Sequence, residues 1–348
     1  MAYQNTGSPR FYINTLEFLL SNGLIPSVLS GFDYELLHTI PTKMIPLPNT
    51  QIYLSPFGSD LTFFYENNQF FAILGHTLGA DAVSYLIQGD AYPFSYVDTA
   101  IKTINASFNT PSQMRFSSPY DGFTLVTYPA DFTNWISLDD FDDSLASSLI
   151  IGNYYDMPYS PELSLTMTRE MDGVDRLRTL GGNDLVDYRY TSATPWGDVG
   201  AWELVYQPTA AEEGLTRKIS RTGRRVWDLS FSHLDDGDVF GSNQRLESLV
   251  GIGQYAPPLS TYGANPNDYE STDLNGSNFE DNILTDNSFY SQVIHKTNGG
   301  QLPFLFQHDS SIMNHQNLAI CKLDMDSFKF DQVANGVYSC KIRIREVW

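Results

Sequence analysis

The fold is decided most clearly by residues 328–347, which read FKFDQVANGVYSCKIRIREV. Two alternating runs flank Asn335-Gly336, a dipeptide that favours a type I′ turn. The stretch therefore predicts a β-hairpin with strands at 328–333 and 338–347. In the second strand the inward residues are Tyr338, Cys340, Ile342 and Ile344, and the outward residues are Lys341, Arg343 and Arg345.

Similar strand signals recur through the rest of the chain. Short runs rich in β-branched or aromatic residues, separated by Gly, Asn and Asp, lie at 61–64, 70–74, 83–87, 123–126 and 149–151. Residues 163–168 alternate strictly and predict a half-buried strand, and residues 226–232 place Trp227, Leu229 and Phe231 on one face. These signals predict a mainly-β fold with two β-sandwich or jelly-roll-like domains.

Two helices are expected within this β framework. Ser8-Pro9 provides a helix start before an apolar stretch at 11–20, and Asn22-Gly23 provides a stop. Asp286 is expected to cap a second helix that ends at Lys296. The first helix belongs to the N-terminal region and the second to the C-terminal domain.

Length and composition divide the chain into three segments. A chain of 348 residues suits two domains of about 100–200 residues each. Residues 1–55 are expected to form the first helix and an extended, Pro-rich arm, and residues 56–165 a jelly-roll-like β-sandwich. Residues 166–348 form a second β domain, with a long polar loop at 254–281 and the C-terminal hairpin.

The chain is acidic, with a formal net charge of −21. Such a field opposes binding to a phosphate backbone, so nucleic acid is not an expected partner. Residues 1–168 carry four basic and 16 acidic residues, a net charge of −12, and the remaining residues carry 16 and 25, a net charge of −9. The shortage of Lys and Arg in the first half indicates either a polar contact surface or a general adaptation of a marine or halotolerant host.

Motifs of enzymes and cofactor sites are missing from the sequence. It contains no phosphate-binding loop, dinucleotide fingerprint, nucleophile elbow or zinc-site spacing. Cys321 and Cys340 alternate with apolar residues and are expected in the core. Oxygen ligands of the kind that Ca²⁺ takes cluster at 139–143, 233–238 and 324–326, although solvated turns explain Asp runs as well. We expect a protein that is not an enzyme, with no catalytic, cofactor-binding or metal-ligating residues.

A basic cluster stands out against the acidic background. Residues 217–225 hold five of the 20 basic residues, which suits either a phosphate or the acidic surface of an adjacent subunit. We expect the subunit contact, because it offsets the charge of the chain itself. The candidate subunit-interface residues, which include cations of the last strand, are Arg217, Lys218, Arg221, Arg224, Arg225, Trp227, Arg343 and Arg345.

The aromatic residues, 21 Tyr, 22 Phe and 5 Trp, have two interpretations. Packing in cores and subunit interfaces is the first, since Tyr and Trp are common in large interfaces. Stacking against sugar rings is the second, at Tyr154-Tyr155 or at Trp196 and Trp202.

Five segments spread along the chain resemble virion proteins of tailed phages, marine ones in particular. They are AYQNTGSPRFY (2–12), IGNYYDMPYSP (151–161), GRRVWDLSF (223–231), TNGGQLPF (297–304) and IREVW (344–348). Separately, FFAILGHTL (70–78) and GFTL (122–125) resemble the galactose-binding-like jelly roll that phage tail and decoration proteins use as a module. Within this group, the chain is similar to tail-tip proteins that form a ring between the tail tube and the hub or fibres.

The resemblance implies a structural protein of the virion that is assembled in the host cytoplasm. Its place would be the distal tail or baseplate, as a homo-oligomeric ring with the tail tube, hub and fibres as partners. The alternative is a carbohydrate-binding receptor or decoration module that engages a host surface glycan. The sequence has no run of 18 apolar residues and no leader pattern, so we expect neither a membrane span nor secretion.

Overall fold

The structure is a computed structural model of the chain. It describes residues 7–23, 27–28, 33–40, 45–46, 50–53, 68–74, 84–89, 100–105, 113–116, 123–128, 135–139, 145–162, 166–170, 174–188, 204–206, 217–220, 224–239, 271–272, 278–279, 287–312, 318–325 and 327–347. Among these residues, no helix is long and apolar enough to cross a membrane.

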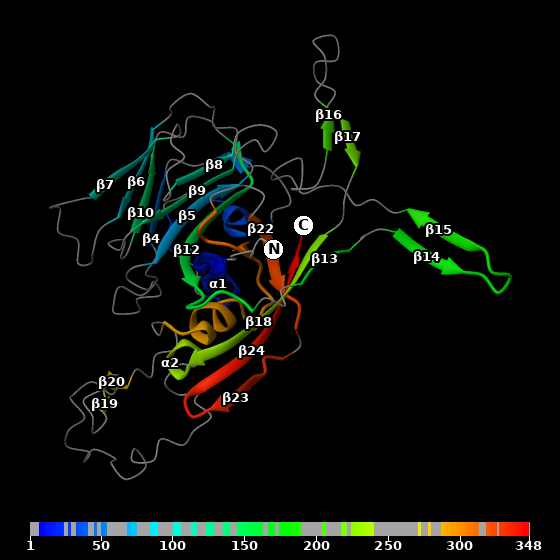
Figure 1. Cartoon of the computed structure of the whole chain (residues 1–348). Helices are drawn as coiled ribbons and strands as arrows, with labels where there is room; N and C mark the ends of the chain where they lie inside the picture. The colour runs from blue at the N-terminus through cyan, green and yellow to red at the C-terminus, as the bar shows by residue number, and fades with distance from the viewer. Residues whose placement is uncertain are drawn as a thin grey trace.

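An 11-stranded antiparallel sheet forms the body of the protein (Figure 1). Its strands in spatial order are β13 (Thr166–Glu170), β18 (Arg224–Asp235), β24 (Val337–Glu346), β22 (Leu318–Leu323), β21 (Phe304–Gln307), β1 (Arg10–Asn14), β12 (Ser148–Asp156), β5 (Gln69–Leu74), β9 (Phe123–Tyr128) and β8 (Gln113–Phe116). The eleventh strand, β23 (Phe330–Ala334), pairs with β24. The expected mainly-β class is therefore confirmed.

The C-terminal hairpin forms as predicted, between β23 and β24. All four expected inward residues of β24 are buried, because alternate side chains of a strand point to opposite faces. The turn differs from the prediction. Gly336 has φ 67°, but Asn335 has no positive φ, and type I′ requires a positive φ at both positions. The register shifts between Gln332 and Ala334, so a bulge accompanies this turn.

The predicted first helix is wrong in its N-terminal half. Residues 10–14 form the strand β1, and the helix α1 spans only Thr15–Ser21. Asn14, rather than Ser8, caps it, because the Asn14 side chain accepts a hydrogen bond from the Glu17 N–H at 3.2 Å. The strand is favoured by pairing on both edges, with β12 and with β21.

Close approach between β1 and β12 requires a glycine. Gly152 lies opposite Asn14, and a Cβ placed on Gly152 would come within 1.8 Å of the Ile13 carbonyl oxygen. No other residue fits at this position without moving the backbone of β1.

The central strands are buried on both faces, in two separate clusters. Phe11 and Ile13 of β1 join one cluster with Trp227, Phe304 and Phe306, whereas their neighbour Tyr12 joins a second cluster. The members of the second cluster are Tyr12, Phe70, Ala72, Leu74, Leu125, Ile150, Leu305, Leu318 and Ile320. Alternation along each strand thus supplies side chains to two cores.

The sheet is continuous between the two predicted domains. Its strands from residues 10–156 lie together on one side, and those from 166–346 lie on the other. They meet where β1 pairs with β21. The predicted N-terminal arm thus contains a central strand of this sheet, and the domain boundaries themselves stay a prediction.

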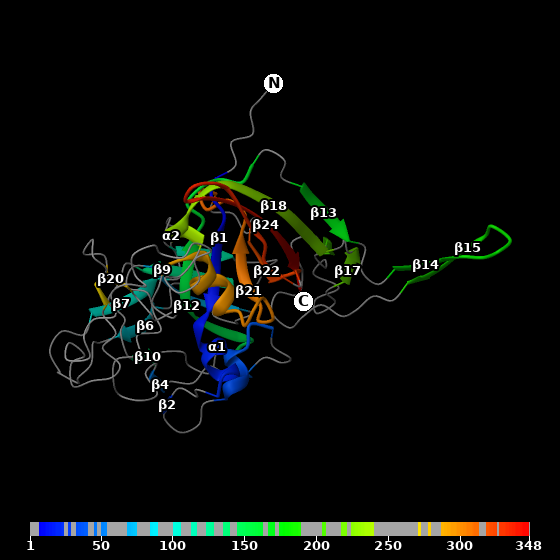
Figure 2. The same ribbon diagram turned by 90° about the horizontal axis from the view of Figure 1, so that it is seen from below.

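A five-stranded sheet lies beside the half of the main sheet that contains β5, β9 and β8 (Figures 1 and 2). Its strands in order are β2 (Ser27–Val28), β4 (Thr50–Tyr53), β10 (Trp135–Asp139), β6 (Ser84–Gly89) and β7 (Ala100–Asn105). Two sheets built from strands that alternate along one stretch of chain suit a β-sandwich. The strand predicted at 61–64 lies outside the described residues.

Four further pairs of strands stand apart from these sheets. They are β11 (Leu145–Ala146) with β3 (Ile45–Pro46), β14 (Val174–Arg178) with β15 (Asp184–Tyr188), β16 (Leu204–Tyr206) with β17 (Arg217–Ser220), and β19 (Ser271–Thr272) with β20 (Asn278–Phe279). The last pair lies within the predicted loop 254–281, whose other residues are outside the described part. The β14–β15 pair projects away from the body in both views (Figures 1 and 2).

Two predictions about strand burial have different outcomes. Trp227, Leu229 and Phe231 of β18 are buried on one face, as expected. A bulge then follows, with His233 at φ 67°, and it returns Leu234 to the same core. Of the strand expected to be half-buried at 163–168, residues 163–165 lie outside the described part. Residues 166–168 belong to β13, and residues 166–169 are exposed rather than half-buried.

The predicted second helix is shorter than expected. The structure has a π-helical segment, η5 (Tyr290–His295), and the Ser288 hydroxyl accepts a hydrogen bond from the Ser291 N–H. Asp286, the expected cap, lies outside the described residues. Its expected apolar face is confirmed, because Phe289, Val293 and Ile294 are buried in the core with Trp227. Two other short helical segments are η1 (Tyr34–Leu37) and α2 (Asp236–Val239).

Candidate functional site

The predicted interface residues occupy different environments. Arg225 and Trp227 are each only 2% exposed, so they belong to the interior of the chain and not to a contact surface. Arg343 and Arg345 lie on the outer face of β24. The remaining members are Arg217 and Lys218 on β17, Arg224 at the start of β18, and Arg221, which lies outside the described residues.

Arg225 is held in the interior by a carboxylate on the neighbouring strand. Its Nη2 lies 2.8 Å from Glu346 Oε1 and its Nε lies 3.0 Å from Glu346 Oε2, and the Arg225 backbone N–H donates to the same carboxylate. Nη2 also donates to the Leu318 carbonyl oxygen at 2.9 Å, and the guanidinium lies 5.1 Å from the centre of the Trp227 ring. The pair therefore joins β18, β24 and β22 through charge-assisted hydrogen bonds.

We use the name charged face for five side chains on the outer side of β13, β18 and β24 and on the segment after β22. They are Glu170, Asp228, Asp324, Arg343 and Arg345. Arg345 Nη2 contacts Glu170 Oε2 at 2.6 Å. Asp228 and Arg343 are directly opposed on β18 and β24, so the face follows from the register of two long strands.

Arg343 is held loosely within the charged face. Its guanidinium nitrogens lie 3.8 Å from Glu170, 3.7 Å from Asp228 and 3.4 Å from Asp324, and its side chain is 47% exposed. These distances exceed the usual 2.7–3.2 Å of an N–H···O bond, and exposed ion pairs of this kind contribute little to stability. Arg343 is therefore half-exposed and only weakly held by three carboxylates of its own chain.

A second surface feature is the projecting β14–β15 hairpin, residues 174–188, which we call the arm. Leu177 and Leu185 are 69% and 60% exposed, and Leu180 at the tip is fully exposed. Sequence analysis did not single out these residues. The signal was present, because Leu-Gly-Gly at 180–182 between two short alternating runs is typical of a hairpin.

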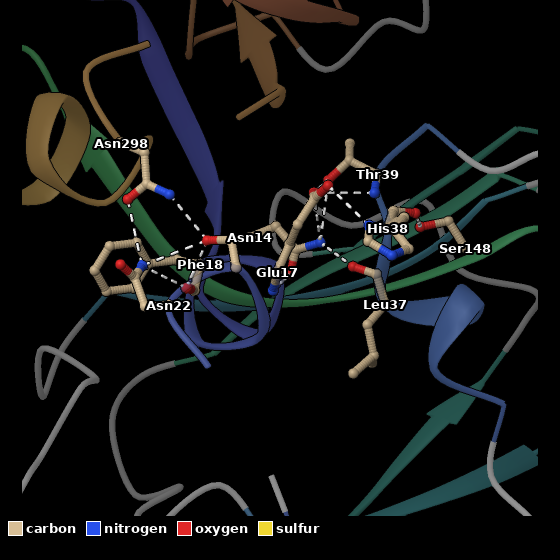
Figure 3. Close-up of polar contacts among 10 residues, drawn as sticks. Asn14, Glu17, Phe18, Asn22, Leu37, His38, Thr39, Ser148 and Asn298 are labelled. Atoms are coloured by element: carbon tan, nitrogen blue, oxygen red, sulfur yellow. Dashed lines mark hydrogen bonds and ion pairs between the residues drawn. The ribbon is translucent and has the colours of Figure 1, made fainter. Parts of the chain in front are cut away.

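A buried polar cluster joins α1 to the segment that follows η1 (Figure 3). The Glu17 carboxylate accepts hydrogen bonds from the Thr39 N–H at 3.0 Å and the Thr39 hydroxyl at 2.6 Å. His38 Nδ1 lies 3.3 Å from the other Glu17 oxygen. The Asn14 side chain donates to the Leu37 carbonyl oxygen at 2.8 Å. These bonds hold residues 37–39 against the N-terminal helix.

The contact between Glu17 and His38 makes this cluster sensitive to pH. The hydrogen bond to Glu17 raises the pKa of His38, and partial burial acts against it. The Ser148 hydroxyl donates to the His38 carbonyl oxygen at 2.6 Å, which connects the cluster to β12 (Figure 3). Sequence analysis did not identify this cluster, because Glu17 and His38 belong to no recognised motif.

The acidic segments considered for Ca²⁺ contribute single carboxylates to local contacts. Asp238 accepts a hydrogen bond from the Asp235 N–H at 3.0 Å, and Asp324 faces Arg343. Residues 140–143 lie outside the described part. Within the described ranges, no three His, Cys, Asp or Glu side chains are grouped as metal ligands.

The aromatic residues considered for sugar stacking are engaged within the chain where they are described. Tyr155 is buried and its hydroxyl donates to the Asp238 carbonyl oxygen. The guanidinium of Arg10 lies 4.2 Å from the centre of the Tyr154 ring and forms a two-armed ion pair with Asp156. Trp196 and Trp202 lie outside the described residues.

Comparison with known proteins adds no family to these observations. No family model, no curated protein and no solved structure matches this chain.

Proposed function

We propose that the protein is a structural component of a tailed-phage virion, a distal-tail or baseplate protein that works in a homo-oligomeric ring. The support from sequence is the resemblance of five segments to virion proteins of tailed phages, among which tail-tip proteins are the most similar group, together with an acidic, Tyr-rich composition. Neighbouring copies, the tail tube, the hub and the fibres would be its partners, and the assembled virion its location. Its role would be mechanical, so its surfaces matter more than any cavity.

The observation that carries this proposal is the loosely held Arg343 on the charged face. The charged face lies on long paired strands, β18 and β24, so its side chains are presented on a rigid support. It carries two cations and three carboxylates, so the contact that we propose with an acidic group of a neighbouring copy is made by Arg343 and not by the face as a whole. Rim charges of this kind direct association and select partners more than they add affinity.

The test is assembly of the purified full chain, followed by light scattering after gel filtration and by negative-stain electron microscopy. We expect closed rings. Arg343→Glu leaves Arg345 as the one cation among the five side chains of the charged face and changes their summed charge from −1 to −3. It is expected to weaken ring formation at least tenfold, with the largest effect at low salt. The matched control is Lys329→Glu, which reverses an exposed cation that contacts Asp331 away from this face.

Two outcomes would overturn the proposal. One is a wild-type chain that stays monomeric at every concentration and salt level. The other is an Arg343→Glu variant that assembles as the wild type does, which would remove the charged face from the ring contact. Gene order provides an independent test, because a tail-tip protein is expected to be encoded just downstream of a tape-measure gene, whereas a capsid gene beside it would indicate a head protein.

A further inference from the structure

Asn-Gly dipeptides are the places where an asparagine side chain reacts most readily with its own backbone, because glycine has no Cβ to hinder the approach. The chain contains four of them, which begin at Asn22, Asn275, Asn298 and Asn335. The structure describes three, and residues 275–276 lie outside the described part. The three described dipeptides share one sequence, so a difference in their reactivity must come from the fold.

Two of the three described dipeptides have asparagine side chains that are held at helix ends. The Asn22 amide donates to the Phe18 carbonyl oxygen at 2.8 Å. The Asn298 amide donates to the Ser21 hydroxyl at 2.9 Å. The two asparagines also contact each other, with Asn22 Nδ2 at 3.3 Å from Asn298 Oδ1 (Figure 3). Neither side chain can turn toward its own backbone without breaking these bonds.

The glycine nitrogens of these two dipeptides are occupied as well. The Gly23 N–H donates to the Leu20 carbonyl oxygen at 3.1 Å, and the Gly299 N–H donates to the Ile294 carbonyl oxygen at 2.8 Å. A nitrogen that donates its proton to a carbonyl group must break that bond before it acts as a nucleophile. Reaction at either dipeptide therefore requires local opening of a helix end, which costs free energy.

Asn335-Gly336 is placed differently, in the turn between β23 and β24. Ala334 and Val337 are the opposed residues that close this turn, and Asn335 between them is exposed. Among the described residues, no group is hydrogen-bonded to the Asn335 side chain or to the Gly336 N–H. An exposed side chain changes rotamer on the picosecond to nanosecond timescale, so the Asn335 side chain freely samples positions beside the Gly336 nitrogen.

We propose that Asn335 is a site of spontaneous deamidation in the folded protein. The Gly336 nitrogen gives up its proton to hydroxide and attacks Asn335 Cγ, so that an N–Cγ bond forms and the Cγ–Nδ2 bond breaks. The leaving nitrogen takes a proton from water and departs as ammonia, and a cyclic succinimide remains. This modification is independent of the structural role proposed for the protein.

Water then opens the succinimide at one of its two carbonyl groups. Cleavage of the bond between nitrogen and Cγ gives aspartate with a normal backbone. Cleavage of the bond between nitrogen and the backbone carbonyl carbon gives isoaspartate, in which the main chain runs through the former side chain. Both routes consume one water and release one ammonia overall, so neither an oxidant nor an enzyme is needed.

Isoaspartate lengthens the main chain at the turn, so its effect depends on how the two flanking strands are held. Among the described strands, β23 pairs with β24 alone, and its residues 331–334 are exposed. In contrast, β24 is also paired with β18 and with β22. We therefore expect the extra backbone atom to loosen β23 and to leave β24 in the sheet.

The first experiment follows deamidation in the purified full chain during incubation in mildly alkaline buffer, where hydroxide is more abundant. Trypsin releases Asn335 within the peptide 330–341. Mass spectrometry compares this peptide with those that contain Asn22 and Asn298. We expect reaction at Asn335 to be at least about tenfold faster than at either of the others, because protected groups react only through local opening. Equal or slower reaction at Asn335 would overturn the proposal.

Incubation of the same chain in guanidinium is the control for local sequence. In the unfolded chain the three dipeptides should react at similar rates, because the contacts that protect Asn22 and Asn298 are gone. If Asn335 keeps the same lead in guanidinium, the fold does not set the order of reactivity, and the structural argument is wrong.

The second experiment measures hydrogen exchange on protein that has been aged until Asn335 is modified. Amides of β23 should exchange faster than in fresh protein, whereas amides of β18 should be unchanged. Asn335→Ser is the matched control, because serine suits a turn but has no amide to lose. Its aged form should exchange as its fresh form does. Unchanged exchange of β23 in the isoaspartate form would contradict the expected loosening.

Discussion

Arg225 and Glu346 form a two-armed ion pair in the interior of the protein, with Nη2–Oε1 at 2.8 Å and Nε–Oε2 at 3.0 Å. Both side chains are almost fully buried. The Arg225 backbone N–H and the Leu318 carbonyl oxygen take part in the same network, so the remaining donors and acceptors of the pair find partners. Burial of the two charges costs free energy of desolvation when the protein folds. Loss of one partner from the folded protein is nevertheless strongly destabilising, because it leaves the other charge buried and uncompensated.

Removal of one charge from this pair should destabilise the protein severely. For Glu346→Gln we expect a loss of about 3–5 kcal/mol in the free energy of unfolding, because the Arg225 charge stays buried without its counter-ion. The control is Asp331→Asn, which breaks the exposed ion pair with Lys329 and should cost less than about 1 kcal/mol. Urea denaturation followed by fluorescence measures both. Similar losses for the two variants would contradict a special role for the buried pair.

The contact between His38 and Glu17 should stabilise the protein at acidic pH. The folded pKa of His38 is raised above its usual value of 6.5, so the protonated form is favoured by folding. This contribution is fully present below about pH 6.5 and is lost as the pH rises through the folded pKa. His38→Gln should therefore lower the melting temperature more at pH 5.5 than at pH 8.5.

His295→Gln is the control for this effect. Burial, with the neighbouring charge of Lys296, lowers the pKa of His295, so protonation of this residue opposes folding. The difference in melting temperature between the wild type and His295→Gln should therefore change with pH in the opposite sense to the difference for His38→Gln. A His38→Gln variant whose effect is the same at both pH values would contradict the assignment.

Lys296 is fully buried, and burial lowers its pKa from 10.5 to about 7. Its Nζ lies 2.8 Å from Gln292 Oε1. Because the unfolded chain binds a proton more tightly than the folded one, this residue makes stability rise between about pH 7 and pH 10.5. Lys296→Met should be more stable than the wild type at pH 7, with a gap that narrows by pH 9.5. Thermal unfolding at the two pH values checks this, and a constant gap would count against it.

Gly152 is required by the distance between β1 and β12. Gly152→Ala should reduce stability by several kcal/mol or prevent folding, since its Cβ would overlap the Ile13 carbonyl oxygen. The control is Gly181→Ala in the turn of the arm, where the Cβ meets nothing within 4 Å. Soluble yield and circular dichroism compare the two, and a stable, fully folded Gly152→Ala protein would show that the β1 contact is adjustable.

The two cysteines should be inert in the folded protein. Burial raises the pKa of Cys340 to about 12 and raises that of Cys321 well above its usual value, so neither thiol ionises at neutral pH. Titration with a chromogenic disulfide reagent should detect almost no thiol in native protein and two per chain in guanidinium. Rapid reaction of either thiol under native conditions would show that its strand opens.

Local patterns predicted those elements whose signal is contained within a short stretch. The alternation of Tyr338, Cys340, Ile342 and Ile344 predicted both the strand and its buried face, and Gly336 marked the turn. The pattern at 11–20 failed because apolar residues near a helix start satisfy helical spacing as well as alternation. Pairing with β12 and β21 then selected the strand for residues 10–14.

The candidate site was only partly accessible to the same reasoning. Arg343 and Arg345 were recognised as outward cations, and the structure places them on the charged face. Arg225 looked like another cation of the basic cluster, but it is buried because Glu346 lies beside it on β24. The distance between these two residues in the sequence is too large for any local pattern to report their contact.

The sequence by itself determined the mainly-β class, the C-terminal hairpin and the buried thiols, because alternation and turn chemistry act between near neighbours. Only the tertiary structure decided that Arg10 lies between Asp156 and Gln307, and hence that the strands of the two halves of the chain form one sheet. It also decided which cations are interior and which remain at the surface. The physical reason is that strand pairing and ion pairing depend on side-chain complementarity between segments far apart in the chain.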